Sequence, residues 1–198
     1  MRNLETPVLK FALYGAHSSL GSLLLGELLS RQHEVVTVVG ELNAVEVRPG
    51  LRAKLGDLFD PLSVSESVAG MDGVICYFDA PDLPTGAADV PPSRGGSLSD
   101  ALAAMEVGMN RAGVGRLLLL ATPEQLDRPS EQLLLQSTLA WTLASPPAVA
   151  QRFVLDDFAA LADAPQASEG YRLRRLAAGL ADELEHPQHL RQQIRFQL

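Results

Sequence analysis

The sequence predicts a single-domain α/β protein, built on a doubly wound parallel sheet with helices on both of its faces. Short apolar runs alternate along the chain with segments of helical periodicity, which is typical of strands joined by crossover helices. One run, residues 116–121, is apolar almost throughout, as expected of a parallel strand buried on both faces. No repeat or linker divides the chain, so residues 1–198 are predicted to form one domain.

The first predicted unit is a strand, a tight turn and a helix. Residues 8–14 form an apolar run that indicates a buried strand, and Gly15 ends it. From Leu20 onward leucines recur at helical spacing, which predicts a helix. A strand, a glycine turn and a helix in this order are typical of the start of a dinucleotide-binding unit. The alternative is a plain strand-to-helix turn of some other parallel-sheet protein.

The residues of this turn suit a pyrophosphate. Gly15 lets the chain reverse sharply, and Gly21 lets the helix lie close to the strand. Free N–H groups at the helix start attract an anion, and Ser18 or Ser19 is a natural N-cap. Ser18 stands where such loops usually carry a further glycine, so its hydroxyl either donates to phosphate or its Cβ obstructs it. The candidate cofactor-binding residues of the turn are Gly15, His17, Ser18, Ser19, Leu20 and Gly21.

The remaining elements follow in alternation. Further strands are expected at residues 33–39, 51–55, 73–78, 116–121, 140–144 and 193–198. Further helices are expected at residues 61–69, 97–112, 129–137 and 171–185. The segment 151–168 fits either a short helix or a loop. Residues 79–96 are rich in proline, glycine and aspartate, and a loop of this length is usually functional or mobile.

Ligands of such sheets bind beyond the carboxyl ends of the strands, where the strand order switches. The turns after several strands should therefore line one crevice. The further candidate cofactor-binding residues in these turns are Gly40, Glu41, Asp57, Leu58, Phe78, Thr122 and Ser145. Thr122 and Ser145 either contact the nicotinamide or the substrate, or serve only as turn hydroxyls.

The end of the second strand predicts the cofactor preference. A 2′-phosphate is typically held there by arginine, but this chain has Gly40 followed by Glu41. A carboxylate at this turn can accept hydrogen bonds from ribose hydroxyls, so NAD(H) is favoured over NADP(H). The alternatives are that Glu41 is a solvated turn residue, or that Arg48 or Arg52 folds over from the next segment.

The composition narrows the class of protein further. With 46% hydrophobic residues the chain can build a sizeable core, and a net charge of −8 without a basic run argues against nucleic-acid binding. The apolar runs are too short for a membrane span and no signal-peptide pattern is present, so we expect a cytoplasmic protein. The single cysteine, Cys76, excludes an intramolecular disulfide and fits a reducing compartment. It lies in an apolar run and is expected to be buried.

Several polar or aromatic residues elsewhere are expected to be structural. The four histidines are scattered and no cysteine accompanies them, so no metal site is expected. Trp141 is expected to pack in the core, and Glu183 and Glu185 are expected on a solvated helix face.

Short blocks in order along nearly the whole chain carry a family resemblance. The blocks are residues 15–21, His33-Glu34-Val35, Gly56-Asp57-Leu58, residues 70–75, residues 112–117, residues 141–146 and residues 182–189. Together they resemble the atypical short-chain dehydrogenase/reductase group of NAD(P)-binding, NADH-flavin reductase-like proteins. The resemblance implies a Rossmann-like fold, an NAD or NADP cofactor, and a place near the adenine for Asp57. Alternatively, Asp57 caps the turn before the helix at residue 61.

The chain also departs from this family. The family's Thr and Gly are replaced by His17 and Ser18, its arginine by Gly40, and its aspartate in the last helix by Arg175. The glycine-serine turn after the fifth strand is replaced by residues 121–124.

The usual acid–base pair of short-chain dehydrogenases is missing. It is a Tyr-x-x-x-Lys pair, in which lysine lowers the pKa of the tyrosine. None of the tyrosines, Tyr14, Tyr77 and Tyr171, has a lysine four residues on, which excludes carbonyl reduction by that mechanism. No catalytic residue is therefore assigned.

Three functions stay open. The first is an oxidoreductase that passes hydride from a nicotinamide to a small-molecule acceptor, either a flavin or a quinone-like compound. The second is a non-catalytic dinucleotide sensor or partner-binding module. The third is a fold that binds no nucleotide.

Overall fold

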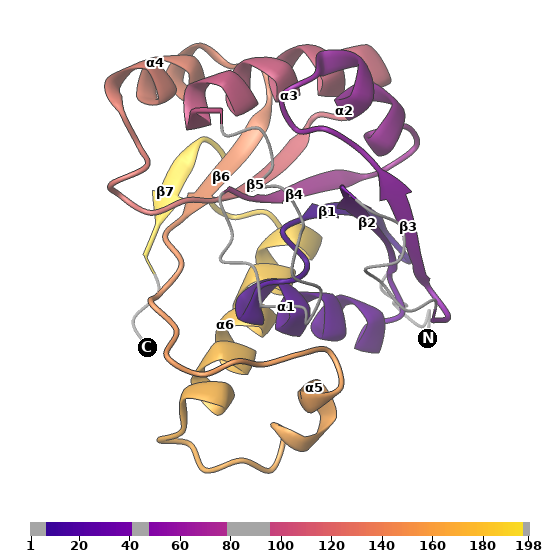
Figure 1. The fold of residues 1–198 in the computed structure, drawn as a ribbon, viewed down its shortest axis with the longest axis vertical. Coiled ribbons are helices and arrows are strands. Elements are labelled where there is room, and N and C mark those ends of the chain that lie inside the picture. The colour runs from indigo at the N-terminus through magenta and orange to yellow at the C-terminus, as the bar shows by residue number, and fades with distance from the viewer. Residues whose placement is uncertain (1–6, 41–47, 79–95, 196–198) are drawn as a thin grey trace, which may run out of the picture.

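The computed structural model describes residues 7–40, 48–78 and 96–195 (Figure 1). Its strands are β1 (Lys10–Tyr14), β2 (Glu34–Val39), β3 (Leu51–Leu55), β4 (Gly73–Tyr77), β5 (Arg116–Leu120), β6 (Ala140–Ala144) and β7 (Gln192–Ile194). Its helices are α1 (Ser19–Ser30), α2 (Pro61–Val68), α3 (Leu98–Ala112), α4 (Arg128–Gln136), α5 (Asp157–Ala160) and α6 (Glu169–Glu185). The segment 151–168, which fitted a helix or a loop, contains the four-residue helix α5.

All seven strands lie in one parallel sheet with the order β3-β2-β1-β4-β5-β6-β7. This confirms the predicted fold class. The predicted last strand is shorter than expected, and residues 196–198 lie outside the described part of the chain. No helix in the described ranges is long and apolar enough to cross a membrane.

The sheet separates two apolar cores. In β1, Phe11 and Leu13 join the core under α1 and α6, whereas Ala12 and Tyr14 join the core under α2, α3 and α4. Figure 1 shows α2, α3 and α4 on one face of the sheet, and α1, α5 and α6 on the other. Successive strand residues point to opposite faces, so covering both faces explains why the central strands are apolar throughout.

Polar side chains begin the helices. Each N-cap residue accepts a hydrogen bond from a backbone N–H of the first turn, which satisfies a group that lacks a partner inside the helix. These N-caps are Ser18 for α1, Asp60 for α2, Ser97 for α3, Asp127 for α4 and Ser168 for α6. The helix starts predicted from the sequence agree with them within two residues.

Glu183 is buried, so its predicted place on a solvated helix face is wrong. Glu183 is only 5% exposed. Its carboxylate accepts hydrogen bonds from Arg116 Nη2 at 3.1 Å, from Thr142 Oγ1 at 3.1 Å and from His189 Nδ1 at 2.8 Å. It also accepts from the backbone N–H groups of Gln188 and His189. Glu183 therefore fastens α6 to β5, to β6 and to the turn before β7.

The prediction for Glu185 is wrong for a similar reason. Its side chain is 9% exposed and its carboxylate pairs with Arg31 Nη1 at 2.6 Å and with His33 Nε2 at 2.7 Å. His33 Nδ1 accepts from the backbone N–H of Leu9, so Nε2 carries the proton and donates to Glu185. This buried group joins the end of α6 to the amino ends of β1 and β2.

The predictions for Trp141 and Cys76 are confirmed. Trp141 is 7% exposed and its Nε1 donates to the carbonyl of Leu134 at 2.7 Å. Cys76 is fully buried, and burial raises the pKa of its thiol to about 12. Such a thiol stays protonated at neutral pH and acts as a small apolar residue.

Candidate dinucleotide-binding site

The turn after β1 stands where the strand order reverses. β1 lies between β2 and β4, so the chain leaves β1 toward β2 in one direction and reaches β4 in the other. A crevice beyond the carboxyl ends of parallel strands is expected at this point. The turn and the start of α1 therefore occupy the ligand-binding position of a doubly wound sheet.

Both glycines of the turn are required by its geometry. Gly15 has a φ of +83°, a conformation that other residues rarely adopt. A Cβ added to Gly21 would lie 2.1 Å from the carbonyl oxygen of Gly15 and 2.8 Å from Ser18 Oγ. This confirms the packing role predicted for Gly21, because the start of α1 lies against the end of β1 with no room for a side chain.

Ser18 turns its hydroxyl into the protein. Its backbone is extended, with φ −77°, so this position does not need glycine. Its Oγ donates to the carbonyl of Gly15 at 3.0 Å and accepts from the N–H of Gly21 at 3.0 Å, and the residue is 1% exposed. The Ser18 hydroxyl thus holds the turn closed rather than facing a ligand.

The first N–H groups of α1 point out of the helix. Those of Ser19 and Leu20 take part in no hydrogen bond between described residues, as expected for the first turn of a helix. Leu20 itself is buried in the core, so only its backbone can serve a ligand. Nearby, His17 Nε2 is buried and has no hydrogen-bond partner in the described part of the chain. The N–H groups of Ser19 and Leu20 can donate to an anion at the positive end of the helix dipole.

The hydroxyl of Ser19 binds a distant segment. Ser19 is 6% exposed, and its Oγ donates to the carbonyl of Gln151 at 3.2 Å and accepts from the N–H of Phe153 at 3.0 Å. The segment after β6 is thereby fastened to the first residue of α1. No local sequence signal points to this contact, because the partners lie more than a hundred residues apart.

Three backbone hydrogen bonds continue the sheet beyond its strands. Gly56 N–H donates to Val39, Phe78 N–H to Leu120, and Ala121 N–H to Ala144, over 2.9–3.2 Å. The turns after neighbouring strands therefore lie side by side at one edge. The predicted site residues that the structure brings to this edge are Gly40, Asp57, Leu58, Phe78, Thr122 and Ser145. Glu41 lies outside the described residues.

Gly40, which follows β2, and Asp57, which follows β3, lie at an exposed part of this edge. Gly40 is exposed, and a Cβ added to it would meet nothing within 4 Å. Asp57 is also exposed, and its carboxylate accepts from the N–H of Phe59 at 2.9 Å, which shapes the turn before α2. Asp60, not Asp57, is the N-cap of α2.

The other predicted site residues at this edge, which we call the rim residues, contact neighbouring side chains. Phe78 is 8% exposed and Leu58 partly buried, and both pack into the core under α2, α3 and α4. The Thr122 hydroxyl forms a hydrogen bond with Glu124 and lowers its pKa. Ser145 Oγ accepts a 3.5 Å hydrogen bond from Gln193 of β7.

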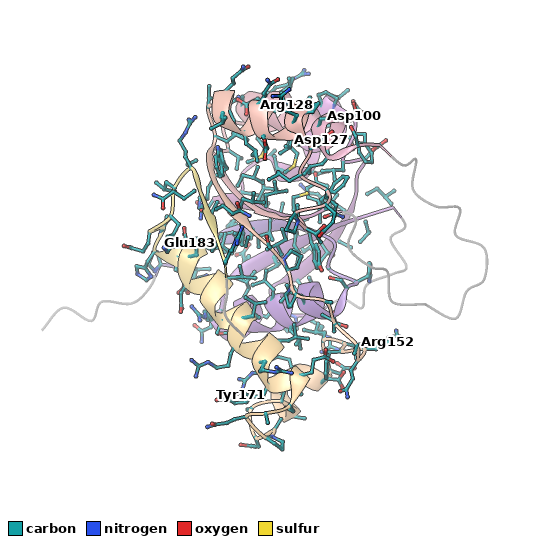
Figure 2. All side chains as sticks on the ribbon, turned by 90° about the vertical axis from the view of Figure 1, so that its left-hand side faces the viewer. Asp100, Asp127, Arg128, Arg152, Tyr171 and Glu183 are labelled. Carbon is teal, nitrogen blue, oxygen red and sulfur yellow. The ribbon has the colours of Figure 1, made fainter. Side chains whose placement is uncertain are left out.

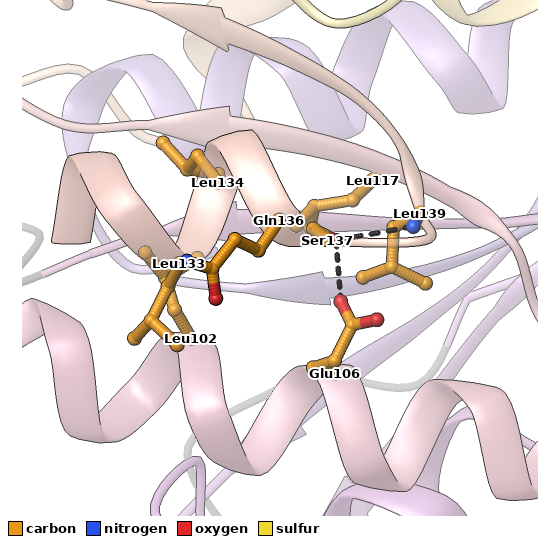
Figure 3. A pocket seen from close by; sticks show the side chains of 8 residues that line it. All are labelled: Leu102, Glu106, Leu117, Leu133, Leu134, Gln136, Ser137 and Leu139. Carbon is orange, nitrogen blue, oxygen red and sulfur yellow. Dashed lines mark hydrogen bonds between the residues drawn. The ribbon is translucent and has the colours of Figure 1, made fainter.

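A cavity of about 230 Å³ lies elsewhere, between α3, α4 and β5 (Figure 3). Leucines form most of its wall. Glu106, at its rim, accepts hydrogen bonds from the Ser137 hydroxyl and from the N–H of Thr138. Leu117 and Leu139 place it near the amino ends of β5 and β6. It is therefore at the opposite end of the strands from the glycine turn.

Comparisons with solved structures show the same fold in distant proteins. A Rossmann-fold NAD(P)-binding family protein from Shigella flexneri is 14% identical, with a TM-score of 0.64 over 96% of this chain and 93% of that one. An oxidoreductase from Lactococcus lactis is 16% identical, with a TM-score of 0.63 over 94% and 90%. A candidate NADH-flavin reductase from Streptococcus pneumoniae is 19% identical, with a TM-score of 0.57 over 94% and 98%.

A search of curated proteins found no significant match. A family model described as NAD(P)H-binding matches residues 15–132, from the first glycine of the turn into α4. This span includes β2 to β5 and is more than half of the chain, so the predicted resemblance to NAD(P)-binding proteins is confirmed. By its sequence, its sheet and its glycine turn, the chain belongs to the NAD(P)H-binding family.

Proposed function

We propose that this chain binds NAD(H) across the carboxyl edge of its sheet and passes hydride to a flavin or a quinone-like acceptor. The observation that carries the proposal is the close approach of α1 to β1 at Gly21, beside which the N–H groups of Ser19 and Leu20 have no hydrogen-bond partner among the described residues. Such groups at a helix start suit a pyrophosphate. The family match to residues 15–132 supports the nicotinamide cofactor. The name of the Streptococcus pneumoniae neighbour supports the acceptor class.

The residues present fit such a cofactor along the edge. The start of α1 would hold the pyrophosphate, and Gly40 and Asp57 would face the adenosine half. Thr122 and Ser145 would stand beside the nicotinamide half, and the bound nicotinamide supplies the hydride. Two stacked rings exchange a hydride when the protein orients them and excludes water, so the missing Tyr-x-x-x-Lys pair does not prevent this reaction.

The first test is the choice of acceptor. The purified protein is expected to oxidise NADH when a flavin or a quinone is added, and to reduce no simple ketone or aldehyde. The reason is that no described rim side chain forms a tyrosine–lysine acid–base pair. The measurement is the loss of NADH absorbance, followed in parallel with a panel of flavins and quinones and with a panel of simple ketones and aldehydes. Robust carbonyl reduction, lost on changing one rim residue, would contradict it.

A second candidate function is a dinucleotide sensor without catalysis. It is favoured by the engagement of the rim hydroxyls, since Thr122 bonds Glu124 and Ser145 bonds Gln193. A sensor would bind NADH but oxidise it with none of the acceptors. The same absorbance assay, run beside a binding titration, therefore separates the two functions.

We further propose a preference for NAD(H) of roughly tenfold, or about 1.4 kcal/mol. The exposed residue after β2 is Gly40 rather than arginine, and the exposed Asp57 carboxylate follows the neighbouring strand β3. A negative charge there repels a 2′-phosphate. Glu41, outside the described residues, is proposed to add to this effect and to accept from the ribose hydroxyls.

The variant Gly40→Arg tests this preference. Open space around Gly40 admits the new side chain without strain, and its guanidinium can pair with a 2′-phosphate. We expect NADPH affinity to rise by about tenfold and NADH affinity to change little. Gly115→Arg is the matched control, because it adds the same charge at an open glycine before β5. Parallel titrations decide the matter, and tighter NADPH binding by the unmodified protein would contradict the preference.

A further inference from the structure

We propose that the cavity between α3, α4 and β5 binds a small primary amine with an apolar body, whose ammonium group pairs with Glu106. The cavity lies near the amino ends of β5 and β6, at the opposite end of the strands from the glycine turn. The proposed site is therefore separate from the candidate dinucleotide site and does not depend on the proposed function.

Five leucines supply the apolar part of the cavity. They are Leu102, Leu117, Leu133, Leu134 and Leu139, and all except Leu133 are at most 5% exposed. Gln136 is exposed and Leu133 partly buried, so the cavity opens to solvent beside the last turn of α4. An apolar cavity of about 150 Å³ takes up benzene. The 230 Å³ measured here has room for one aromatic ring with a short alkyl chain.

The two helices beside the cavity are joined by hydrogen bonds at one end of it. Figure 2 shows Asp100, in the first turn of α3, close to Asp127, the N-cap of α4. The helices therefore start at the same end and run in the same direction. After the last turn of α4, the Ser137 hydroxyl donates to the Glu106 carboxylate of α3, as the dashed line in Figure 3 shows. This bond sets the distance between the two helices where the cavity lies.

The end of α4 is also fastened to the sheet. Trp141 Nε1 of β6 donates to the carbonyl of Leu134 at 2.7 Å. The Arg191 guanidinium donates to the carbonyls of Leu135 at 2.8 Å and Ser137 at 2.7 Å. Because these bonds hold the last turn of α4, the helix cannot close onto the leucines, and the cavity is a preformed site.

The Glu106 carboxylate has room for one more donor. Its Oε1 accepts from Asn110 Nδ2 at 3.0 Å, from the N–H of Thr138 at 2.9 Å and from Thr138 Oγ1 at 2.7 Å. Its Oε2 accepts only from the Ser137 hydroxyl. A carboxylate oxygen has two lone pairs, so Oε2 can accept a further hydrogen bond. None of these donors is charged, and no cation in the described part of the chain forms an ion pair with Glu106.

These groups select the chemical class of the ligand. Burial alone would raise the pKa of Glu106, but hydrogen bonds from Ser137 and Thr138 lower it, so the carboxylate is ionised at neutral pH. An ionised carboxylate beside apolar walls repels anions and attracts a cation more strongly than it would in water. The Gln136 side chain forms no hydrogen bond with a described residue, and its amide oxygen offers a second acceptor. A primary ammonium group has three N–H donors and matches both acceptors.

The test compares three probes of similar size: phenethylamine, its neutral analogue phenethyl alcohol, and its anionic analogue hydrocinnamate. A two-dimensional NMR titration of the whole protein measures each Kd and identifies the residues whose signals shift. We expect the amine to bind about tenfold more tightly than the alcohol, and the anion to show no binding. The shifted signals should include those of the leucines that line the cavity.

Three variants check the role of each part of the cavity. Glu106→Gln keeps the shape of the side chain but removes its charge, so the Kd for the amine should rise about tenfold, to that of the alcohol. Glu131→Gln is the matched control, because it removes an exposed carboxylate of α4 that does not line the cavity, and it should leave both Kd values unchanged. Leu133→Phe adds bulk at the opening and should weaken the binding of both the amine and the alcohol.

The outcomes decide the proposal in either direction. If the unmodified protein binds no amine, or binds amine and alcohol equally, the proposal is overturned. Equal losses in Glu106→Gln and Glu131→Gln would also overturn it, since they would show only an effect of net charge. If Glu106→Gln does not fold, Leu133→Phe decides the matter: weaker amine binding supports the cavity as the site, and unchanged binding places the amine elsewhere and overturns the proposal.

Discussion

Replacing Gly21 with alanine is expected to lower the affinity for NADH at least a hundredfold, or about 2.7 kcal/mol. The added Cβ would lie 2.1 Å from the carbonyl oxygen of Gly15, which is backbone and has no freedom to move aside. The start of α1 must therefore shift away from β1, and the N–H groups of Ser19 and Leu20 leave their positions. Calorimetric titration with NADH measures the loss, and circular dichroism confirms that the variant is folded.

Gly115→Ala is the matched control for this experiment. A Cβ at Gly115 meets nothing within 4 Å, so the same chemical change should alter neither binding nor fold. If Gly21→Ala is folded and binds NADH as tightly as the unmodified protein, the turn between Gly15 and Gly21 is not the pyrophosphate site.

The second large effect is expected on stability. Glu183→Gln should lower the free energy of unfolding by about 3–5 kcal/mol, because it leaves the Arg116 guanidinium buried without its charged partner. The Arg116 side chain is only 10% exposed. Urea unfolding measures the change. Asp182→Asn is the control: that neighbouring carboxylate is 69% exposed, and its ion pair with Arg31 should be worth less than about 1 kcal/mol. Equal effects of the two variants would contradict the role of Glu183.

The Glu183 carboxylate also predicts that the free energy of unfolding depends on pH. Burial alone would raise the pKa of Glu183, but hydrogen bonds from His189, Gln188 and Thr142 lower it below its ordinary value of 4.5. A carboxylate with a lowered pKa stabilises the fold above that ordinary value, and this contribution is lost as the pH falls through the folded-state pKa. The stability difference between the unmodified protein and Glu183→Gln should therefore shrink when unfolding is measured below pH 4.5.

Local patterns were sufficient to predict most of the fold. Apolar runs marked the strands because both faces of the sheet are covered, and polar N-caps such as Ser18 and Asp60 marked the helix starts. The glycine turn was predictable because both glycines are required by the backbone. Gly15 has a positive φ, and a Cβ at Gly21 would collide with the carbonyl oxygen of Gly15. These signals lie within a few residues of the feature that they predict.

The contacts that sequence reasoning missed join residues far apart in the chain. Glu183 looked like a solvated helix residue, yet its partner Arg116 lies 67 positions away. Glu183 does follow Leu180 by three residues on the apolar stripe of α6, which was a usable signal that this face is buried. Glu185 pairs with Arg31 across 154 positions. A charged residue gives no local sign that a distant partner will neutralise it.

In the candidate site too, local features could be predicted from the sequence, whereas contacts between distant residues could not. The sequence alone pointed to the turn residues and to the rim residues that follow the strands, and the structure brings the described ones to one edge. The contact of Ser19 with Gln151 spans 132 positions, so only the fold shows that the segment after β6 lies beside the start of α1.

The most direct test of the central claim is a calorimetric titration of the unmodified protein with NADH and NADPH. The glycine turn and the open N–H groups of α1 predict binding of one dinucleotide per chain, with NADH the tighter ligand. Absence of heat with both dinucleotides at millimolar concentration would contradict dinucleotide binding by this chain.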